Sequence, residues 1–136
     1  MTLLGARNET QKQMYQGLRY SRGFKSTDEV HSYFKELLDE CEKADSCALN
    51  VANRVLIHKS EKFKVNPEYA KQLFDLYKAE VNEANFVTES KEIVKSCNDW
   101  VKNMTNGKIA NILQSLNEDD RAVLINAIYF KGMWET

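Results

Sequence analysis

Apolar residues return at helical spacing in two stretches of the first 80 residues. Ser26 and Glu29 stand in the spacing of a capping box, and apolar side chains then recur every three or four positions. This pattern predicts an amphipathic helix over 27–44. An asparagine followed by a proline at 66–67 is typical of the start of a helix, and the apolar spacing extends this second helix over 67–79.

A third helix is predicted over 90–106, where apolar residues again follow helical spacing and Gly107 is placed to end the helix. Its apolar stripe consists of Ile93, Cys97, Trp100, Val101 and Met104. The stretch 10–18 is less periodic and predicts a shorter helix.

Three stretches between and after these helices predict strands. Residues 47–58 alternate, with Leu49, Val51, Val55 and Ile57 on one face and Asn50, Ala52 and Arg54 on the other. Residues 81–86 are a weaker candidate, and their Asn and Glu content suits an edge strand. Residues 122–130 are almost continuously apolar, which predicts a strand buried on both faces, with Asn126 in its middle in need of hydrogen-bond partners.

The order of these elements favours an α+β fold. The chain begins helical and then alternates strand and helix, which suggests parallel pairing through helical crossovers. A strand buried on both faces is central in its sheet, yet 122–130 is the last predicted element. Further strands are therefore expected to pair beside it, and the sequence is expected to be truncated.

The composition fits one domain without a strongly charged partner. The 136 residues are 43% hydrophobic and include one proline, which is enough for a single domain with a core. The net charge of -1 does not favour nucleic acid or an anionic membrane surface as a partner. No apolar run approaches the roughly 20 residues needed to cross a bilayer, so we expect a soluble protein.

The candidate catalytic and metal-binding residues are few and scattered. The chain has three cysteines, Cys41, Cys47 and Cys97, so at least one thiol is free or pairs outside this chain. Their number does not show whether the protein is in an oxidising or a reducing compartment. The two histidines, His31 and His58, do not have H-x-x-x-H spacing, and the cysteines do not have C-x-x-C spacing. Isolated residues of this kind are most often structural, so we predict no catalysis, no metal and no cofactor.

Two further patterns concern the surface. Asn8 and Asn103 head N-x-[ST] sequons and would accept glycans if the chain enters the secretory pathway. Residues 28–45 contain seven acids and two lysines, a balance of -5, which is typical of a solvated helix face.

Three motifs resemble those of one family. The segment 123–136, VLINAIYFKGMWET, resembles the serpin signature, in which an Asn-bearing apolar strand leads into F-K-G-x-W. The TNGKI at 105–109 is similar to the T-x-G-K-I turn that ends helix F of that family, and 49–56 resembles its "xxANRLF" strand. The motifs occur in the family's order and the resemblance covers essentially the whole chain, so the chain is identified as a member of the serpin family of serine protease inhibitors.

The resemblance implies a partial serpin fold, with helices C to F packed on strands 1 to 3 of sheet A, in a single partial domain over 1–136 that is truncated at both ends. Residues 1–7 correspond to the end of helix B, 10–20 to helix C, 27–44 to helix D, 47–58 to strand 2A, 67–79 to helix E, 80–86 to strand 1A, 90–106 to helix F and 121–131 to strand 3A. The reactive-centre loop presented to proteases would lie in the missing part, so these residues alone should not inhibit.

The resemblance also implies a suicide-substrate mechanism, in which a serine protease cleaves the loop and the loop then inserts into sheet A beside strand 3A. Asn126 would belong to the shutter, where the sheet opens, although a satisfied core amide is the simpler alternative. Trp134 would lie at the breach, where the loop first enters, and could also be a core aromatic. One wall of the slot would consist of Val123, Leu124, Ile125, Asn126, Ala127, Ile128, Tyr129, Phe130 and Lys131.

Two functional alternatives remain open within the family. The parent protein is an inhibitor of a serine protease, or a non-inhibitory serpin that acts as a carrier, chaperone or storage protein. A natural short product or a truncated gene sequence is a third possibility. We expect a secreted protein, with a cytoplasmic serpin as the alternative. The acidic stretch 28–45 is expected to repel heparin, because heparin-activated serpins carry basic residues on helix D.

Overall fold

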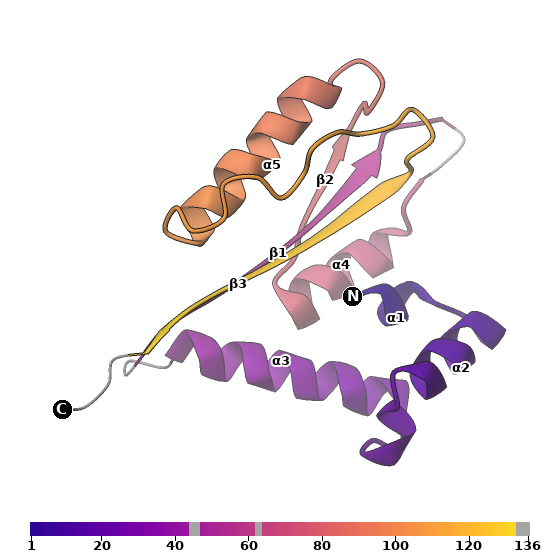
Figure 1. The fold of residues 1–136 in the computed structure, drawn as a ribbon. Coiled ribbons are helices and arrows are strands. Elements are labelled where there is room, and N and C mark those ends of the chain that lie inside the picture. The colour runs from indigo at the N-terminus through magenta and orange to yellow at the C-terminus, as the bar shows by residue number, and fades with distance from the viewer. Residues whose placement is uncertain (44–46, 62–63, 133–136) are drawn as a thin grey trace.

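The computed structural model describes residues 1–43, 47–61 and 64–132. Within them, helices and strands follow one another in the order that the sequence predicts (Figure 1). The helices are α1 (Thr2–Gly5), α2 (Asn8–Gly17), the 3-10 helix η1 (Tyr20–Arg22), α3 (Thr27–Lys43), α4 (Pro67–Tyr77) and α5 (Ser90–Met104). The strands are β1 (Cys47–His58), β2 (Glu80–Ala84) and β3 (Ala122–Gly132).

The predicted helix ends are confirmed by their capping bonds. The Ser26 hydroxyl accepts a hydrogen bond from the Glu29 N–H at 3.2 Å, and the Asn66 side chain accepts one from the Glu68 N–H at 2.9 Å. Beyond α5, Gly107 has a φ of 77°, in the left-handed region that favours glycine, and its N–H donates to the Lys102 carbonyl at 2.7 Å.

The three strands form one sheet in the order β2-β1-β3. β1 and β2 run parallel and are joined through α4, as predicted, and β2 is an edge strand. β1 and β3 run antiparallel, so the expectation of parallel crossovers throughout was wrong. The reason lies in 105–121, which runs back along α5 and returns the chain to the end of the sheet where β1 stops (Figure 1).

One side chain holds this return segment against α5. The side-chain Oδ1 of Asn98 accepts hydrogen bonds from the backbone N–H groups of Ile112, at 2.9 Å, and Leu113, at 3.0 Å. Its Nδ2 donates to the Leu113 carbonyl at 2.9 Å. The segment then joins the sheet, where the His58 N–H donates to the Arg121 carbonyl at 2.9 Å.

Helices cover the sheet on two sides, with α5 on one side and α1, α3 and α4 on the other (Figure 1). The core beside α5 includes Ala52, Leu56, Phe86, Ile93, Cys97, Val101, Ile125 and Ala127. The core on the other side includes Leu4, Val55, Ile57, Leu73, Tyr77 and Ala79. β1 therefore contributes to both cores through its alternating side chains.

The strand buried on both faces is β1, whereas the sequence predicted this for 122–130. In β3, Ile125 and Ala127 are buried against α5, but Ile128 and Phe130 on the opposite face are 57% and 65% exposed. A continuous apolar run does not say which residues are covered, because cover depends on the elements packed against each face.

Candidate functional site

The candidate site begins with two asparagines at directly paired positions of neighbouring strands. Asn53 of β1 lies opposite Asn126 of β3, so both side chains stand on the same face of the sheet. The Asn126 Nδ2 donates to the Asn53 Oδ1 at 2.7 Å. The polar residue in the middle of β3 thus has the hydrogen-bond partner that the sequence required.

The hydrogen bonds continue from the asparagine pair into the helical layer. The Asn53 Nδ2 donates to the backbone carbonyl of Tyr77, at the end of α4, with a distance of 2.8 Å. The Tyr77 hydroxyl lies 2.5 Å from Nδ1 of His31 in α3. The asparagine network, defined as Asn126, Asn53, Tyr77 and His31, therefore connects two strands and two helices.

Burial fixes the charge states inside this network. Asn53, Tyr77 and His31 are all at least nine-tenths buried. Burial raises the pKa of Tyr77 to about 12, so its hydroxyl stays protonated. Burial lowers the pKa of His31, and the nearby N-terminal ammonium group lowers it further, although the Asp28 carboxylate opposes this. The Tyr77–His31 hydrogen bond therefore joins two neutral groups at neutral pH.

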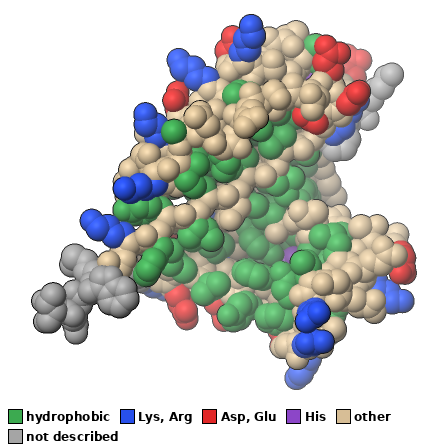
Figure 2. All heavy atoms as spheres, in the orientation of Figure 1, with side chains coloured by type: hydrophobic (Ala, Val, Ile, Leu, Met, Phe, Trp, Pro, Cys, Tyr) green, Lys and Arg blue, Asp and Glu red, His purple; other side chains and the backbone are tan. Residues whose placement is uncertain are grey.

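An apolar groove of about 720 Å³ opens beside the asparagine pair. Its lining comes from α1, α2, η1, α3, β1, the end of α4 and β3, and Asn53 and Asn126 are among the lining residues. Figure 2 shows hydrophobic side chains gathered over this face of the sheet and the helices beside it. Leu37 and Ile128 line the groove and are exposed. The described residues therefore leave this apolar surface open.

The nine positions of the predicted slot wall lie along β3, which pairs with β1 through one edge only. No other strand pairs with β3 among residues 1–43, 47–61 and 64–132. The side chains alternate, since Ile125 and Ala127 face α5 while Leu124, Ile128 and Phe130 share the face of Asn126. Trp134, predicted at the breach, lies outside the described residues.

The sequence reasoning missed three members of the asparagine network. Asn53 has the same parity as the apolar residues Val51 and Val55, so an amide on an otherwise apolar face was the signal that could have found it. His31 and Tyr77 are 46 residues apart, and no spacing rule connects them. Only the packing of α4 on α3 brings them together.

Two of the three cysteines have described side chains, and each lies on a helix. Cys97 is buried, burial raises the pKa of its thiol, and Cys41 is half-buried on α3. Within the described ranges, no three potential metal ligands are grouped to hold an ion. The same residues include no helix with the length and apolar content to span a membrane. Asn8 and Asn103 are exposed, and their glycosylation stays a prediction.

The acidic face of α3 is partly neutralised by two lysines, Lys78 at the end of α4 and Lys35 of α3 itself. Lys78 reaches Asp39 at 2.8 Å and Glu42 at 2.5 Å, and Lys35 reaches Asp39 at 2.6 Å. Hydrogen bonds from these two lysines lower the pKa of Asp39 to about 2. The acidic character of α3 nevertheless remains, because Glu36 and Glu40 are exposed with no ion pair to another described residue.

Comparison with known proteins places this architecture in one family. A family model described as serpin (serine protease inhibitor) matches residues 1–136, and the chain therefore belongs to the serpin family. The family members that match this chain are inhibitors or ovalbumins and not enzymes, so the protein is not an enzyme. The structure supports the same assignment, because its α+β arrangement matches part of the serpin fold.

The similar proteins include inhibitors and ovalbumins. Serpin B6 of Bos taurus is 37% identical over 139 residues, and the match covers 100% of this chain and 36% of the relative. Leukocyte elastase inhibitor of Sus scrofa is 37% identical over 138 residues, with 99% and 35% covered. Emu ovalbumin (Dromaius novaehollandiae) has a solved structure with a TM-score of 0.86 and 34% identity, covering 98% of this chain and 38% of that one. The native-state structure of the thermophilic serpin tengpin gives 0.83 at 30% identity, covering 99% and 33%.

The chain thus spans little more than a third of the length of the relatives that it matches. The names of these relatives do not support the expectation of a secreted protein over the cytoplasmic alternative.

Proposed function

We propose that this chain supplies the part of a serine protease inhibitor's central sheet beside which a further strand inserts. The observation that carries the proposal is the free edge of β3, which pairs with β1 alone among the described strands. A free strand edge presents main-chain N–H and C=O groups that an extended segment can pair with. In the mechanism implied by the family, that segment is the reactive-centre loop after cleavage by a serine protease.

The asparagine network supports the proposed role of Asn126 in the shutter. A strand that inserts beside β3 separates it from its next neighbour, while β3 has to stay attached to β1. The hydrogen bond from the Asn126 side-chain amide to Asn53 adds to the eleven-position pairing of the two strands and anchors it, through the Tyr77 carbonyl, to the end of α4. The proposed role of Trp134 at the breach rests on the resemblance alone.

α5 is proposed to yield during insertion, as helix F does in the mechanism that the resemblance implies. Its buried stripe of Ile93, Cys97 and Val101 packs on side chains of both β1 and β3. A change in the spacing or twist of these strands therefore alters the surface on which α5 lies, and the helix has to adjust with them.

The 136 residues by themselves are proposed to be non-inhibitory, because the elements that the resemblance assigns to them do not include the reactive-centre loop. The protease would be the partner of a protein that carries both the loop and this sheet. In this proposal no residue of the asparagine network makes or breaks a covalent bond. The network holds the strands in position.

A non-inhibitory serpin is the second candidate. The similar proteins include leukocyte elastase inhibitors, whose names state an inhibitory activity, and ovalbumins, whose names do not. The identities of the two groups are alike, at 37% and 34%, so they do not separate the candidates. A carrier, chaperone or storage role would keep the same sheet without requiring it to open.

A chimera distinguishes the two candidates. Residues 1–136 replace the matching part of pig leukocyte elastase inhibitor, and the product is mixed with elastase. A sheet that accepts the loop gives a covalent complex that withstands denaturing electrophoresis. A folded chimera that elastase cleaves without forming a complex would contradict the inhibitory proposal and favour the second candidate.

Variants of the chimera test the shutter role. Asn126→Ala is expected to lower the fraction of elastase trapped and raise the fraction of chimera cleaved. Asn82→Ala, on the exposed surface of edge strand β2, is the matched control and is expected to leave this partition unchanged. Equal partition in both variants would argue against a role for Asn126 in insertion.

A further inference from the structure

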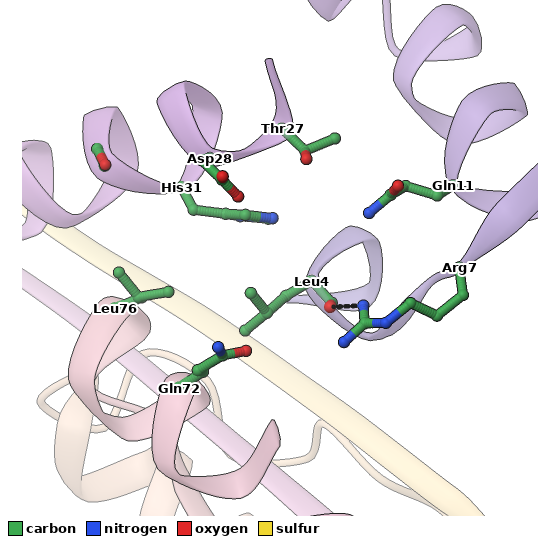
Figure 3. Close-up of a pocket in the computed structure, with 9 residues that line it drawn as sticks. Leu4, Arg7, Gln11, Thr27, Asp28, His31, Gln72 and Leu76 are labelled. Carbon is green, nitrogen blue, oxygen red and sulfur yellow. Dashed lines mark hydrogen bonds between the residues drawn. The ribbon is translucent and has the colours of Figure 1, made fainter. Parts of the chain in front are cut away.

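A second cavity, of about 410 Å³, opens between the N-terminal helices and α4 (Figure 3). Its walls come from α1, α2, α3 and α4, and we call it the polar cavity. Small-molecule sites are typically about 300–1,000 Å³, with a few polar groups that converge on the ligand. In Figure 3 the side chains of Arg7, Gln11, His31 and Gln72 extend toward one another from four separate segments.

His31 is the buried polar group at this site. Only 5% of the residue is exposed, and its Nδ1 is occupied by the Tyr77 hydroxyl at 2.5 Å. Its Nε2 has no hydrogen bond to any described residue, and the imidazole lines the polar cavity. No buried side-chain nitrogen or oxygen of the described residues lacks a hydrogen-bond partner, so Nε2 is open to the cavity and can form a hydrogen bond with a bound molecule.

The polar cavity also presents one charge of each sign. The Arg7 guanidinium is held in place because Nη1 donates to the Leu4 carbonyl at 2.8 Å and to the Ala6 carbonyl at 2.9 Å. Its Nη2 and Nε form no hydrogen bond with another described residue and are left for a ligand. Asp28, in the first turn of α3, forms no ion pair with another described residue.

The two charges define what the site can hold. A simple anion would meet the Asp28 carboxylate, and a simple cation would meet the Arg7 guanidinium, so each would experience one repulsion. A molecule with both charges satisfies both groups. Leu4 and Leu76 add an apolar part to the lining, which suits a short aliphatic chain.

We propose that the polar cavity binds a small aliphatic zwitterion of the α-amino acid class. The ligand carboxylate pairs with the Arg7 guanidinium, in the planar geometry that arginine favours, and its ammonium group pairs with Asp28. The aliphatic chain lies over Leu4 and Leu76, while His31 completes the polar contacts. The proposal does not depend on the serpin mechanism, because none of the cavity's residues belongs to the sheet.

Three probes of matched size separate the charge requirements. The ¹⁵N-labelled chain is titrated with L-leucine, with 4-methylpentanoate, which lacks the ammonium group, and with 3-methylbutylamine, which lacks the carboxylate. The readouts are the imidazole signals of His31 and the side-chain amide signals of Gln11 and Gln72. L-leucine is expected to give saturable shifts, with each of the other probes binding at least about tenfold more weakly.

Two substitutions test the assigned contacts. Arg7→Gln and Asp28→Asn are each expected to weaken L-leucine binding by about tenfold or more. Arg22→Gln, an exposed arginine in η1, is the charge-matched control and should leave the affinity unchanged. Arg7 and Asp28 are both exposed, so thermal melts are expected to match the parent chain and to show that lost binding is not lost folding.

Several results would overturn the proposal. They are the absence of saturable shifts with L-leucine, equal affinity for the three probes, or unchanged L-leucine affinity in both variants. Should Arg7→Gln melt early, Asp28→Asn alone decides, through its loss of preference for L-leucine over 4-methylpentanoate.

Discussion

Asn53 and Asn126 occupy paired positions of β1 and β3, and the side-chain Nδ2 of Asn126 donates to the side-chain Oδ1 of Asn53 at 2.7 Å. Asn53→Ala is expected to cost about 1–3 kcal/mol in the free energy of unfolding, because it leaves the Tyr77 carbonyl and the Asn126 amide without their partner. Asn126→Ala is expected to cost less, about 0.5–1.5 kcal/mol, since Asn126 is more exposed. Urea unfolding of both single variants and the double variant measures the coupling, and strictly additive losses would contradict it.

The lowered pKa of His31 predicts a loss of stability on acidification. The unfolded chain keeps the ordinary histidine pKa of about 6.5, whereas burial lowers the pKa of the folded His31. The unfolded state therefore binds more protons as the pH falls through about 6.5, and the free energy of unfolding decreases there. In urea unfolding between about pH 7.5 and pH 5.5, His31→Gln should flatten this dependence. An equally steep dependence in the variant would assign it to another group.

The two faces of β3 predict opposite outcomes for the same substitution. Ile125 is 4% exposed beside α5, so Ile125→Lys buries a charge and is expected to cost about 3–5 kcal/mol. Ile128 is 57% exposed, so Ile128→Lys should keep the fold and weaken self-association through the open apolar face. Sedimentation over a range of concentrations measures this association. A parent chain that stays monomeric throughout would show that the open face does not associate.

Gly107 and Gly17 form a matched pair for the cost of a left-handed conformation. A Cβ on either residue would meet no atom within 4 Å, so only the backbone conformation distinguishes them. Gly107 has a φ of 77°, and Gly107→Ala is expected to cost about 1–2 kcal/mol. Gly17→Ala, in the last turn of α2, should be neutral or stabilising by up to about 1 kcal/mol. Equal urea midpoints for the two variants would contradict the capping role of Gly107.

The acidic face of α3 predicts no retention on heparin resin at about physiological ionic strength, where charges are screened beyond roughly 8 Å. Lys78 and Lys35 are engaged by Asp39, which leaves Glu36 and Glu40 to repel a polyanion. The double variant Glu36→Lys, Glu40→Lys reverses these charges and is expected to increase retention. Retention of the parent chain that the double variant does not exceed would contradict this account.

The local elements were predictable because their signals are local. The capping residues Ser26 and Asn66 and the terminal Gly107 marked helix ends within a few positions of those observed. The faces of β1 followed from alternation. What could not be predicted was the direction of β3 and the exposure of its outer face, since both depend on how 105–121 returns and on which elements cover the strand.

One residue of the candidate site was predictable from the sequence, and its partners were not. Asn126 was found because an amide inside an apolar strand must be paired, whatever the fold. Its partner Asn53 lies 73 residues earlier, and the link through Tyr77 to His31 depends on four elements meeting. A contact of this kind follows from tertiary packing, which periodicity does not encode.

The amide of Asn98 has a consequence for the order in which the chain folds. Its three hydrogen bonds hold Ile112 and Leu113 beside α5, and β3 can reach β1 only after the chain has reversed there. β1 and β3 are far apart in sequence, so bringing them together without that reversal requires closing a long, entropically costly loop. The helix and its return segment shorten the loop that has to close, so the Asn98 hydrogen bonds are expected to speed the pairing of β3 with β1.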